Sequence, residues 1–408
     1  MKKIKSILMF SALAAAFTLT SCEDEGENKG GGSNPPVSNQ VEKSGQITAD
    51  ETWTADKTYI LDGRVTVTGG ATLTIEPGTV VKANPGAGSV SSALLIARDG
   101  KIMANGTASE PIIFTTIADD IESGDVASPN MDVENNGLWG GVIILGQAPI
   151  RASTTEAQIE GIPSSDQNGL YGGSDANHSS GEFSYVSIRH GGTLIGAGNE
   201  INGLTLGGVG SGTKIHHIEV VANQDDGIEW FGGTVNVSDV LIWNSSDDGL
   251  DTDQDWIGTC DNFIIINPRD GGSAFELDGP EGPNAATGTH WFKNGTVYAG
   301  DDVLHLVDWD DETNAALENV YFYGLPSGYA ATADFSPFQS FGGDMSGTTA
   351  NLQITINGGT LADLFDGGVV PAGVTEVAEG ANTVGANNGE FAGWTWAAVS
   401  GELSKIGQ

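Results

Sequence analysis

The chain has 408 residues, and its 54 acidic residues against 16 basic ones give a formal net charge of −38 at pH 7. Such a charge repels nucleic acid, so we expect no nucleic-acid partner, and it favours divalent cations. With 60 glycines and no long helical pattern, the composition also argues against a helical protein.

The N-terminus has the pattern of an export signal. Basic residues precede an apolar stretch over residues 7–17, which is too short to span a bilayer. The next four residues, Leu19 to Cys22, are similar to a bacterial lipobox, in which the signal is removed before a cysteine that is then lipidated. We therefore predict a signal peptide over residues 1–21 and lipidation of Cys22; a plain secretory signal is the alternative.

Residues 22–44 are rich in Glu, Gly, Ser and Pro, and we predict that they form a flexible tether. The acidic residues directly after Cys22 resemble the signal that sends lipoproteins of Bacteroidota to the outer face of the outer membrane. The protein is accordingly expected to be lipid-anchored in the outer membrane and exposed at the cell surface. Cys260 is the only other cysteine, so we expect no intramolecular disulfide and a buried Cys260.

Short β-branched runs separated by Gly, Asn and Asp begin near residue 45. No amphipathic helices of 10–15 residues lie between them, which disfavours βαβ folds, and a β-sandwich would not explain a fixed repeat. Two longer polar segments, residues 117–138 and 150–182, are expected to project from one face as insertions. The predicted strands include Val65–Val67, Leu73–Ile75, Leu94–Ile96, Ile112–Phe114 and Val142–Leu145.

A sequence repeat provides the strongest evidence for the fold. The segment Ile218–Trp230 is followed by the similar segment Val240–Thr252, with matching residues 22 positions apart. A period of this size is typical of solenoids, in which each unit buries its apolar face against its neighbours. Three short strands and three turns per coil fit this period. We therefore predict an all-β, right-handed parallel β-helix over residues 45–345.

The period is lost over residues 346–408, which we predict to be a C-terminal cap region. Leu361–Phe365 has the pattern of a helical turn. Trp394 and Trp396 are expected to cover the open end of the solenoid, because the last strands of a stack must be protected from pairing with other chains.

Several segments resemble the pectin-lyase-like superfamily, and specifically its outer-membrane lipoproteins of unassigned activity. The resemblance covers most of residues 60–310 and is specific for the fold but weak for the function. It implies a parallel β-helix. The segments that carry it are Gly70–Lys82, Gly100–Thr107, Pro111–Thr115, Leu138–Leu145 and Tyr185–Gly192.

The repeat also stacks carboxylates on carboxylates. If Ile228 and Leu250 point inward, Glu229 and Asp251 point outward on neighbouring coils, which lie about 4.8 Å apart. In the next coil the same alternation is expected to turn Phe275 and Leu277 inward. In the coil after that, Leu304 is expected to point inward and His305 outward.

Stacked carboxylates repel one another, and hard cations such as Ca²⁺ take six to eight oxygen ligands. We therefore predict bound Ca²⁺ on this face. The alternative is a solvated acidic surface whose Asp-Asp-Gly triplets only form turns. The predicted ligands are Asp225, Asp226, Glu229, Asp247, Asp248, Asp251, Asp253, Asp270, Glu276 and Asp278.

Aromatic residues near the same repeat indicate sugar binding, since the faces of sugar rings stack on flat aromatic rings. The candidates are Trp243, Trp256 and Trp309, with packing in the core as the alternative. Trp230 falls on the inward phase and is expected in the core.

Catalytic candidates follow from the resemblance. The superfamily includes lyases that use Ca²⁺ with a Lys or Arg base, and Arg269, beside Asp270, is the first candidate here, ahead of Arg189, Lys214 and Lys293. It also includes hydrolases with paired aspartates, for which Asp226 and Asp248 are candidates. The companion motifs of those hydrolases, Asn-Thr-Asp, Gly-His-Gly and Arg-Ile-Lys, are absent from the sequence.

Histidines are candidates for a transition-metal site. His305, near Asp308 and Asp310, is one and is also a catalytic candidate, and the adjacent pair His216 and His217 is another. Neither has the paired spacing that marks a strong site.

These features predict a cell-surface lipoprotein whose β-helix binds an extracellular polysaccharide with the help of Ca²⁺, beside an outer-membrane barrel protein as a candidate partner. One alternative is a polysaccharide lyase or glycoside hydrolase. A second alternative is a structural or adhesive subunit of an outer-membrane complex.

Overall fold

The structure is a computed structural model that describes residues 39–86, 88–193, 201–281, 285–310, 312–332, 335–339, 350–404 and 406. The predicted signal peptide, Cys22 and the tether up to residue 38 lie outside the described residues. Within the described residues, none of the helices has the length and apolar character needed to cross a membrane.

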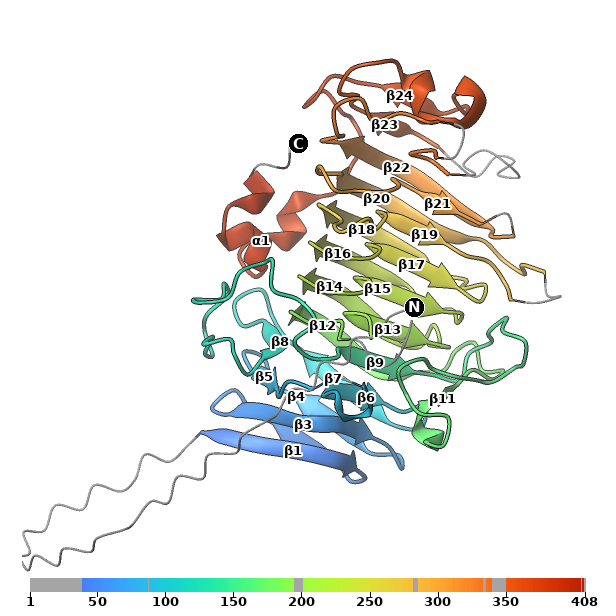
Figure 1. Cartoon of the computed structure of the whole chain (residues 1–408). Coiled ribbons are helices and arrows are strands. Elements are labelled where there is room, and N and C mark those ends of the chain that lie inside the picture. Colours follow the sequence, from blue (N-terminus) through green and yellow to red (C-terminus); the bar gives the residue numbers. More distant parts are fainter. Residues whose placement is uncertain are drawn as a thin grey trace, which may run out of the picture. The chain divides into compact units, whose positions relative to one another are not determined.

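The chain forms a right-handed parallel β-helix, which confirms the predicted fold (Figure 1). Its strands stack into three parallel ladders, which we call ladders A, B and C, and each regular coil adds one strand or half-strand to each ladder. Ladder A contains the second halves of β1 (Gln40–Ile47) and β3 (Thr58–Val67), then β6 (Ala93–Ile96), β9 (Val142–Leu145), β13 (Leu204–Gly207), β15 (Ile228–Phe231), β17 (Leu250–Asp253), β19 (Phe275–Leu277) and β21 (Asp308–Trp309).

Ladders B and C share long strands that bend once. Ladder B takes the first half of each long strand and ladder C takes the second half. The long strands are β12 (Gly181–Arg189), β14 (Lys214–Val221), β16 (Val237–Trp243), β18 (Thr259–Ile266), β20 (His290–Tyr298) and β22 (Ala315–Tyr323). Ladder B begins with three separate strands, β2 (Glu51–Trp53), β4 (Thr72–Ile75) and β7 (Lys101–Asn105). Ladder C also contains the first halves of β1 and β3. Its other separate strands are β5 (Val80–Ala83), β8 (Ile112–Thr116), β23 (Leu352–Ile354) and β24 (Val374–Glu376).

One residue with positive φ makes the bend in each long strand. Asparagine occupies this position in the later coils because its side chain tolerates the left-handed region, as at Asn294 (φ 56°) and Asn319 (φ 58°). The amide of Asn319 donates to the Asn294 side chain at 3.1 Å, so the bends of neighbouring coils are hydrogen-bonded to each other. In earlier coils the position holds His217 and Asp239 instead.

A continuous apolar core fills the space between the three ladders. Ile228, Leu250, Phe275 and Leu277 are fully buried in it, which confirms their predicted inward orientation. Cys260 and Trp230 are also fully buried, as predicted.

Glycine ends each Asp-Asp-Gly triplet because successive coils approach closely there. A Cβ atom on Gly227 would lie 2.5 Å from the carbonyl oxygen of Gly249, and one on Gly249 would lie 2.7 Å from that of Ala274. We expect Gly249→Ala to lower the free energy of unfolding by about 1–3 kcal/mol, because the coils must move apart. Urea denaturation measures this, and an unchanged midpoint would contradict the close approach.

The two ends of the solenoid differ from the predicted boundaries. Parallel pairing already begins at Gln40, and it continues beyond residue 345 through β23 and β24. The predicted helical turn is present as η3 (Leu361–Leu364). The remaining short helices are η1 (Gly88–Val90), η2 (Gln167–Gly169), η4 (Asp366–Gly368), η5 (Asn388–Phe391), α1 (Trp396–Val399) and η6 (Glu402–Ser404).

The C-terminal tryptophans lie against the side of the solenoid, so the prediction that they cover its end is wrong. Trp394 and Trp396 pack on the outer face of ladder C, where the Trp396 ring lies 6.0 Å from that of Trp243. Figure 1 shows α1 beside the stack of long strands. This face carries apolar side chains such as Leu241 and Ile264 that would otherwise meet solvent.

Both predicted insertions are present, but they lie at opposite ends of the ladder A strands and do not project from one face. Residues 117–141 connect β8 of ladder C to the start of β9, and residues 146–180 connect the end of β9 to ladder B. Figure 1 shows the two loops on opposite sides of the strands. The second insertion contains the hairpin β10 (Ala157–Gln158) and β11 (Leu170–Tyr171).

Candidate functional site

A row of carboxylates follows the outer face of ladder A. The strand registers place Glu229 beside Asp251, Asp251 beside Glu276, and Glu276 beside Asp308. The first three members are the row that the sequence predicted. Because the coils are in register, four successive coils each place one carboxylate on the same line.

The fourth member of the row is Asp308. The prediction that His305 points outward in this coil is wrong. Leu304 is 43% exposed, whereas His305 is buried and its Nδ1 lies 2.7 Å from the carbonyl oxygen of Ser336. Residues 303–306 lie outside any strand, and the two-residue alternation holds only in extended strands. The His305 ring stacks on Phe335 at 5.1 Å, so it has a packing role.

The aspartates of the repeated turns link one coil to the next. Asp226 Oδ1 accepts a hydrogen bond from the backbone N–H of Asp248 at 2.9 Å, and Asp248 Oδ1 accepts one from that of Ser273 at 2.5 Å. The middle residue of the Asp-Asp-Gly triplet therefore holds the turn of the following coil. Burial is the main cause that raises the pKa of Asp248 well above the ordinary range, and the nearby Glu276 raises it further.

Two overlapping triplets bring carboxylate oxygens within 4.8 Å of one another. We call Asp226, Glu229 and Asp251 the inner triplet, since each is at most 8% exposed. We call Asp225, Asp226 and Asp247 the outer triplet, since Asp247 is exposed and Asp225 is partly buried. Asp226 belongs to both triplets, so the two form one cluster.

Burial and mutual repulsion dominate the electrostatics of the inner triplet. Burial is the main cause that raises the pKa of Asp226, Glu229 and Asp251 well above the ordinary range, and neighbouring carboxylates raise it further. For all three carboxyl groups the largest contributions to the shift come from burial and from other carboxylates. The alternative of a solvated acidic surface is therefore wrong for the inner triplet.

The same effects extend along the ladder. Burial raises the pKa of Asp253 to about 7 and that of Asp278 to about 7, and in both cases nearby carboxylates add to the shift. Asp253 ends β17, and the backbone N–H of Asp278 donates to the carbonyl oxygen of Thr252 at 2.8 Å. Asp270, in contrast, lies on an exposed turn outside both triplets.

Asn202 is a member of the cluster that the sequence did not reveal. Its amide nitrogen donates to the carboxylate of Glu229 and to Thr205 Oγ1, the latter at 3.3 Å. The register of β13 with β15 places Asn202-Gly203 at the position of Asp226-Gly227 in the next coil. That alignment could have identified it, but the spacing there is 24 residues and the first aspartate is missing.

Several oxygens in this buried region have no hydrogen-bond partner among the described residues. Among them are Asp251 Oδ1 and Asn202 Oδ1, whose side chains are at least nine-tenths buried. An unpaired buried acceptor carries a desolvation cost of about 1–3 kcal/mol. Carboxylate and amide oxygens without nearby donors are the ligands that Ca²⁺ takes, and Ca²⁺ accepts irregular geometry.

The three tryptophans predicted to stack on sugars are buried, so that prediction is wrong. Trp256 is fully buried and stacks on Trp230 in the core, with ring centroids 4.6 Å apart. Trp243 and Trp309 are 7% and 5% exposed. None of the three presents a ring face to a ligand.

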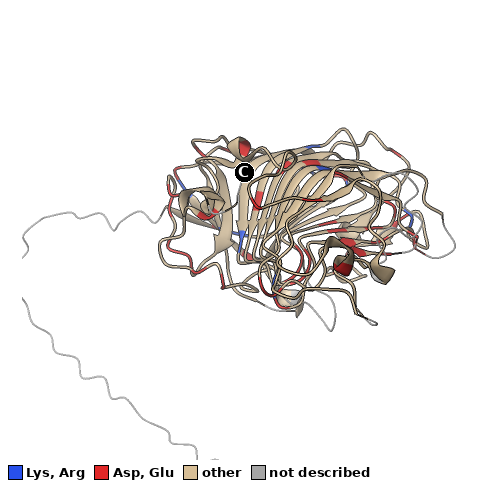
Figure 2. Cartoon of the chain, turned by 90° about the horizontal axis from the view of Figure 1, so that it is seen from above, with Lys and Arg blue, Asp and Glu red and all other residues tan. Residues whose placement is uncertain are grey.

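The basic candidates for a lyase base are all paired with glutamates. Arg269 forms an ion pair with Glu134 from the first insertion. Arg189 is fully buried with Glu219, Lys214 pairs with Glu182, and Lys293 pairs with Glu318. Figure 2 shows how few basic residues lie among the acidic ones.

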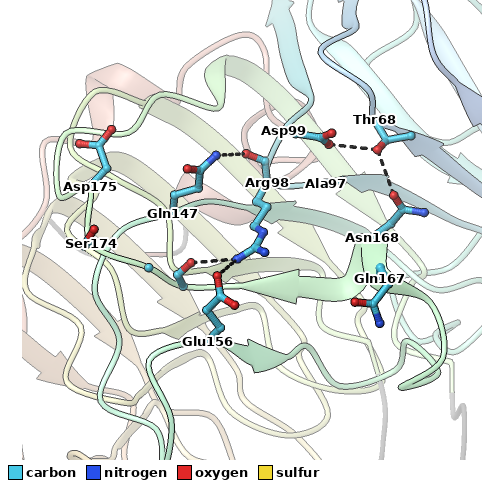
Figure 3. A pocket seen from close by; sticks show the side chains of 12 residues that line it. Thr68, Ala97, Arg98, Asp99, Gln147, Glu156, Gln167, Asn168, Ser174 and Asp175 are labelled. Carbon is cyan, nitrogen blue, oxygen red and sulfur yellow. Dashed lines mark hydrogen bonds and ion pairs between the residues drawn. The ribbon is translucent and has the colours of Figure 1, made fainter.

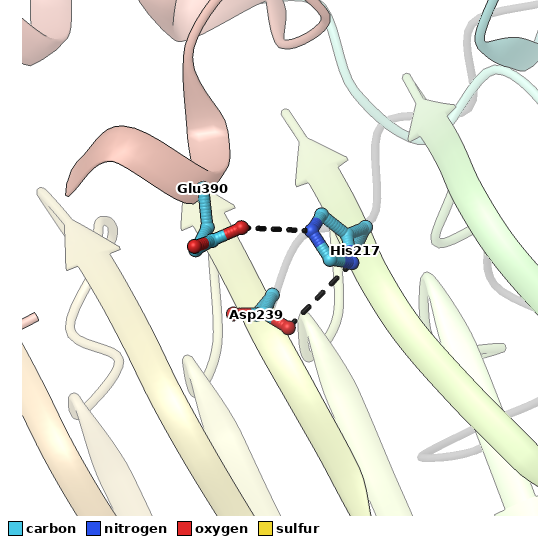
Figure 4. Close-up of side chains that lie close together, drawn as sticks. All are labelled: His217, Asp239 and Glu390. Carbon is cyan, nitrogen blue, oxygen red and sulfur yellow. Dashed lines mark hydrogen bonds and ion pairs between the residues drawn. The ribbon is translucent and has the colours of Figure 1, made fainter. Parts of the chain in front are cut away.

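A third cluster contains His217, Asp239 and Glu390 (Figure 4). The Nδ1 atom of His217 lies 3.5 Å from Asp239, and its Nε2 atom lies 3.4 Å from Glu390 of η5. The neighbouring backbone N–H of Asn387 donates to the bend residue Asn262 at 2.7 Å. These contacts dock the C-terminal segment on the bends of the long strands, which gives the cluster a structural role.

A family model described as a pectate-lyase-like beta helix domain matches residues 45–397. No curated protein and no solved structure matches the chain.

Proposed function

We propose, since the chain belongs to the pectate-lyase-like beta helix domain family, that ladder A is a calcium-dependent binding face for an extracellular glycan. The protein would present this face at the cell surface, held to the outer membrane through the lipid on Cys22. The sequence from Leu19 to Cys22 supports the anchor.

The observation that carries the calcium part is the inner triplet. Three buried carboxylates lie within 4.8 Å of one another beside the two unpartnered oxygens of Asp251 and Asn202. Without a cation, the folded chain must either protonate these groups or bury their charge, and both are costly. A Ca²⁺ ion at this position would neutralise them and use the unpaired oxygens as ligands.

The outer triplet supports the glycan part. Asp247 is exposed, so a Ca²⁺ ion held there would keep positions open to solvent, where hydroxyl or carboxylate oxygens of a sugar could replace water. The first insertion borders this region, since the Asn136 amide donates to Ser246 Oγ at 2.6 Å. The insertion and the turn thus form an edge along which an extended ligand would lie.

The test is affinity electrophoresis of the protein on gels that contain neutral or acidic polysaccharides, with Ca²⁺ or with a chelator. We expect at least one polysaccharide to retard the protein in Ca²⁺ only, and Asp247→Asn to abolish the retardation. The matched control is Asp301→Asn, which removes an exposed aspartate from another turn and should change nothing. If no polysaccharide retarded the protein more strongly in Ca²⁺ than in the chelator, the proposal would be refuted.

One observation favours an enzyme as the second candidate. Asp253 and Asp278, with pKa values of about 7, are suited to proton transfer at neutral pH, which a glycoside hydrolase requires. New reducing ends released from a retarding polysaccharide would reveal a hydrolase. New ultraviolet absorbance from unsaturated uronates would reveal a lyase, for which the paired state of Arg269 and the other basic candidates is unfavourable.

A further inference from the structure

A cavity that is separate from the carboxylate cluster lies between the second insertion and the turns of the early coils. Its volume is about 560 Å³, within the range of about 300–1,000 Å³ that small-molecule sites occupy. One wall is formed by Thr68 and by Arg98 and Asp99 in the turn between β6 and β7. The opposite wall is formed by the insertion, including Gln167 and Asp175 (Figure 3).

Both walls are held in place by contacts that do not need a ligand. Asp166 of the insertion pairs with Arg64 at 2.5 Å, and Thr68 Oγ1 donates to the Asn168 side chain at 2.9 Å. The Gln147 amide donates to the carbonyl oxygen of Arg98 at 3.0 Å. A cavity with fixed walls loses little conformational entropy when a ligand binds.

Most of the lining is polar, and it contains both hydrogen-bond donors and acceptors. Amides, carboxylates, hydroxyls and one guanidinium line the cavity together with Ala97 and the backbone of two glycines. Glycine is required at Gly172 because its φ is +89° and an added Cβ would lie 2.8 Å from Ile150 Cδ1. The backbone therefore forms part of the wall directly.

The charge of the lining selects against anions. Arg98 is the basic lining residue and is already ion-paired with Glu156, whereas Asp99 and Asp175 add two further negative charges. A phosphate, sulfate or uronate group would be repelled. A ligand that both donates and accepts hydrogen bonds and carries no charge fits best, and sugar hydroxyls have these properties.

We infer that this cavity binds a neutral saccharide, independently of Ca²⁺. This site is distinct from the calcium-dependent face of ladder A, so each of the two binding proposals can be confirmed or refuted without the other. The second insertion takes part in both sites. Its Glu160 helps to raise the pKa of Glu229 on ladder A, and its Gln167 and Asp175 line the cavity.

The experiment is calorimetric titration of the full folded chain, in a chelator, with neutral oligosaccharides built from glucose, mannose, xylose or galactose, and with oligogalacturonate as the anionic comparison. Because the lining is polar, we expect a dissociation constant of about 0.1–1 mM for at least one neutral oligosaccharide. Oligogalacturonate should bind at least tenfold more weakly.

Two variants locate the site. Ser174→Trp would fill the cavity from its exposed rim, and Gln167→Ala would remove an exposed hydrogen-bonding group. Each substitution should weaken saccharide binding about tenfold or more, which is equivalent to about 1.4 kcal/mol of binding free energy. Ser165→Trp, at an exposed position of the same insertion outside the lining, is the matched control and should bind as the wild type does. Absence of binding to every neutral oligosaccharide, unchanged binding by both cavity variants, or stronger binding of oligogalacturonate would overturn the inference. Asp247→Asn should leave this binding intact even if it abolishes calcium-dependent retardation.

Discussion

Calcium is expected to raise the melting temperature of the chelator-treated protein, and Asp251→Asn is expected to remove most of that rise. A ligand at a hundredfold excess over its dissociation constant stabilises the folded state by about 2.7 kcal/mol, which corresponds to a few degrees for a chain of this size. Asp251 contributes to the inner triplet and carries an unpartnered buried oxygen, so its loss removes a ligand at the centre of the cluster. Differential scanning calorimetry with and without Ca²⁺ measures both effects.

The same substitution is expected to stabilise the protein when Ca²⁺ is absent. Burial raises the pKa of Asp251 well above its ordinary value, and each unit of such a shift costs about 1.4 kcal/mol of stability at a pH above the folded-state value. Asparagine has a similar shape and does not carry this cost. If Asp251 binds metal, Asp251→Asn changes the stability in opposite directions with and without Ca²⁺. If Asp251 has only a packing role, the substitution destabilises both the Ca²⁺-bound and the Ca²⁺-free protein.

The control for Asp251→Asn is Asp301→Asn, which should change neither the stability nor the response to Ca²⁺, because Asp301 is exposed. If Ca²⁺ raised the melting temperature of Asp251→Asn as much as that of the wild type, the inner triplet would not be the site.

Without Ca²⁺, stability is expected to fall as the pH rises from about 4 to about 8. Asp253 and Asp278 have pKa values of about 7 in the folded chain, against an ordinary value near 4 in the unfolded chain. Between those values the folded chain holds more protons than the unfolded chain, so raising the pH favours unfolding. The inner triplet, whose pKa values are also raised, extends the loss to higher pH.

Urea denaturation midpoints across this pH range measure the effect. Saturating Ca²⁺ should remove most of the decline, because the metal replaces the protons as the source of neutralisation. General repulsion within a chain of high negative charge also predicts a decline, so a matched pair of double variants is needed. Asp253→Asn with Asp278→Asn should flatten the curve, whereas Asp301→Asn with Asp302→Asn, which removes two exposed charges, should leave its slope nearly unchanged. Equal slopes in the two double variants would contradict the role given to the buried carboxylates.

The fold could be predicted from the sequence because the solenoid is encoded locally. The 22-residue repeat places Ile228 above Leu250 in the core and Glu229 above Asp251 on the outside, and both placements depend only on strand alternation and the period. Where the chain leaves the extended conformation, as it does before β21, the same reasoning misplaced Leu304 and His305.

The burial of the site could not be predicted in this way, because it depends on segments far apart in the sequence. Asp226 hydrogen-bonds across a coil boundary, Asn202 enters from the preceding coil, and Glu160 of the second insertion adds its charge. The position of the C-terminal segment also depends on contacts between residues far apart in the sequence. Trp396 covers an apolar face of ladder C, and the residue pattern of one strand does not show that this face will be covered.

Anomalous X-ray diffraction tests most directly whether the inner triplet holds Ca²⁺. Crystals grown with Ca²⁺ should show an anomalous difference peak within about 2.3–2.6 Å of oxygens from Asp226, Glu229 and Asp251, and the peak should be absent after soaking in a chelator. A map from fully Ca²⁺-equilibrated crystals with no peak among these three side chains would contradict the account.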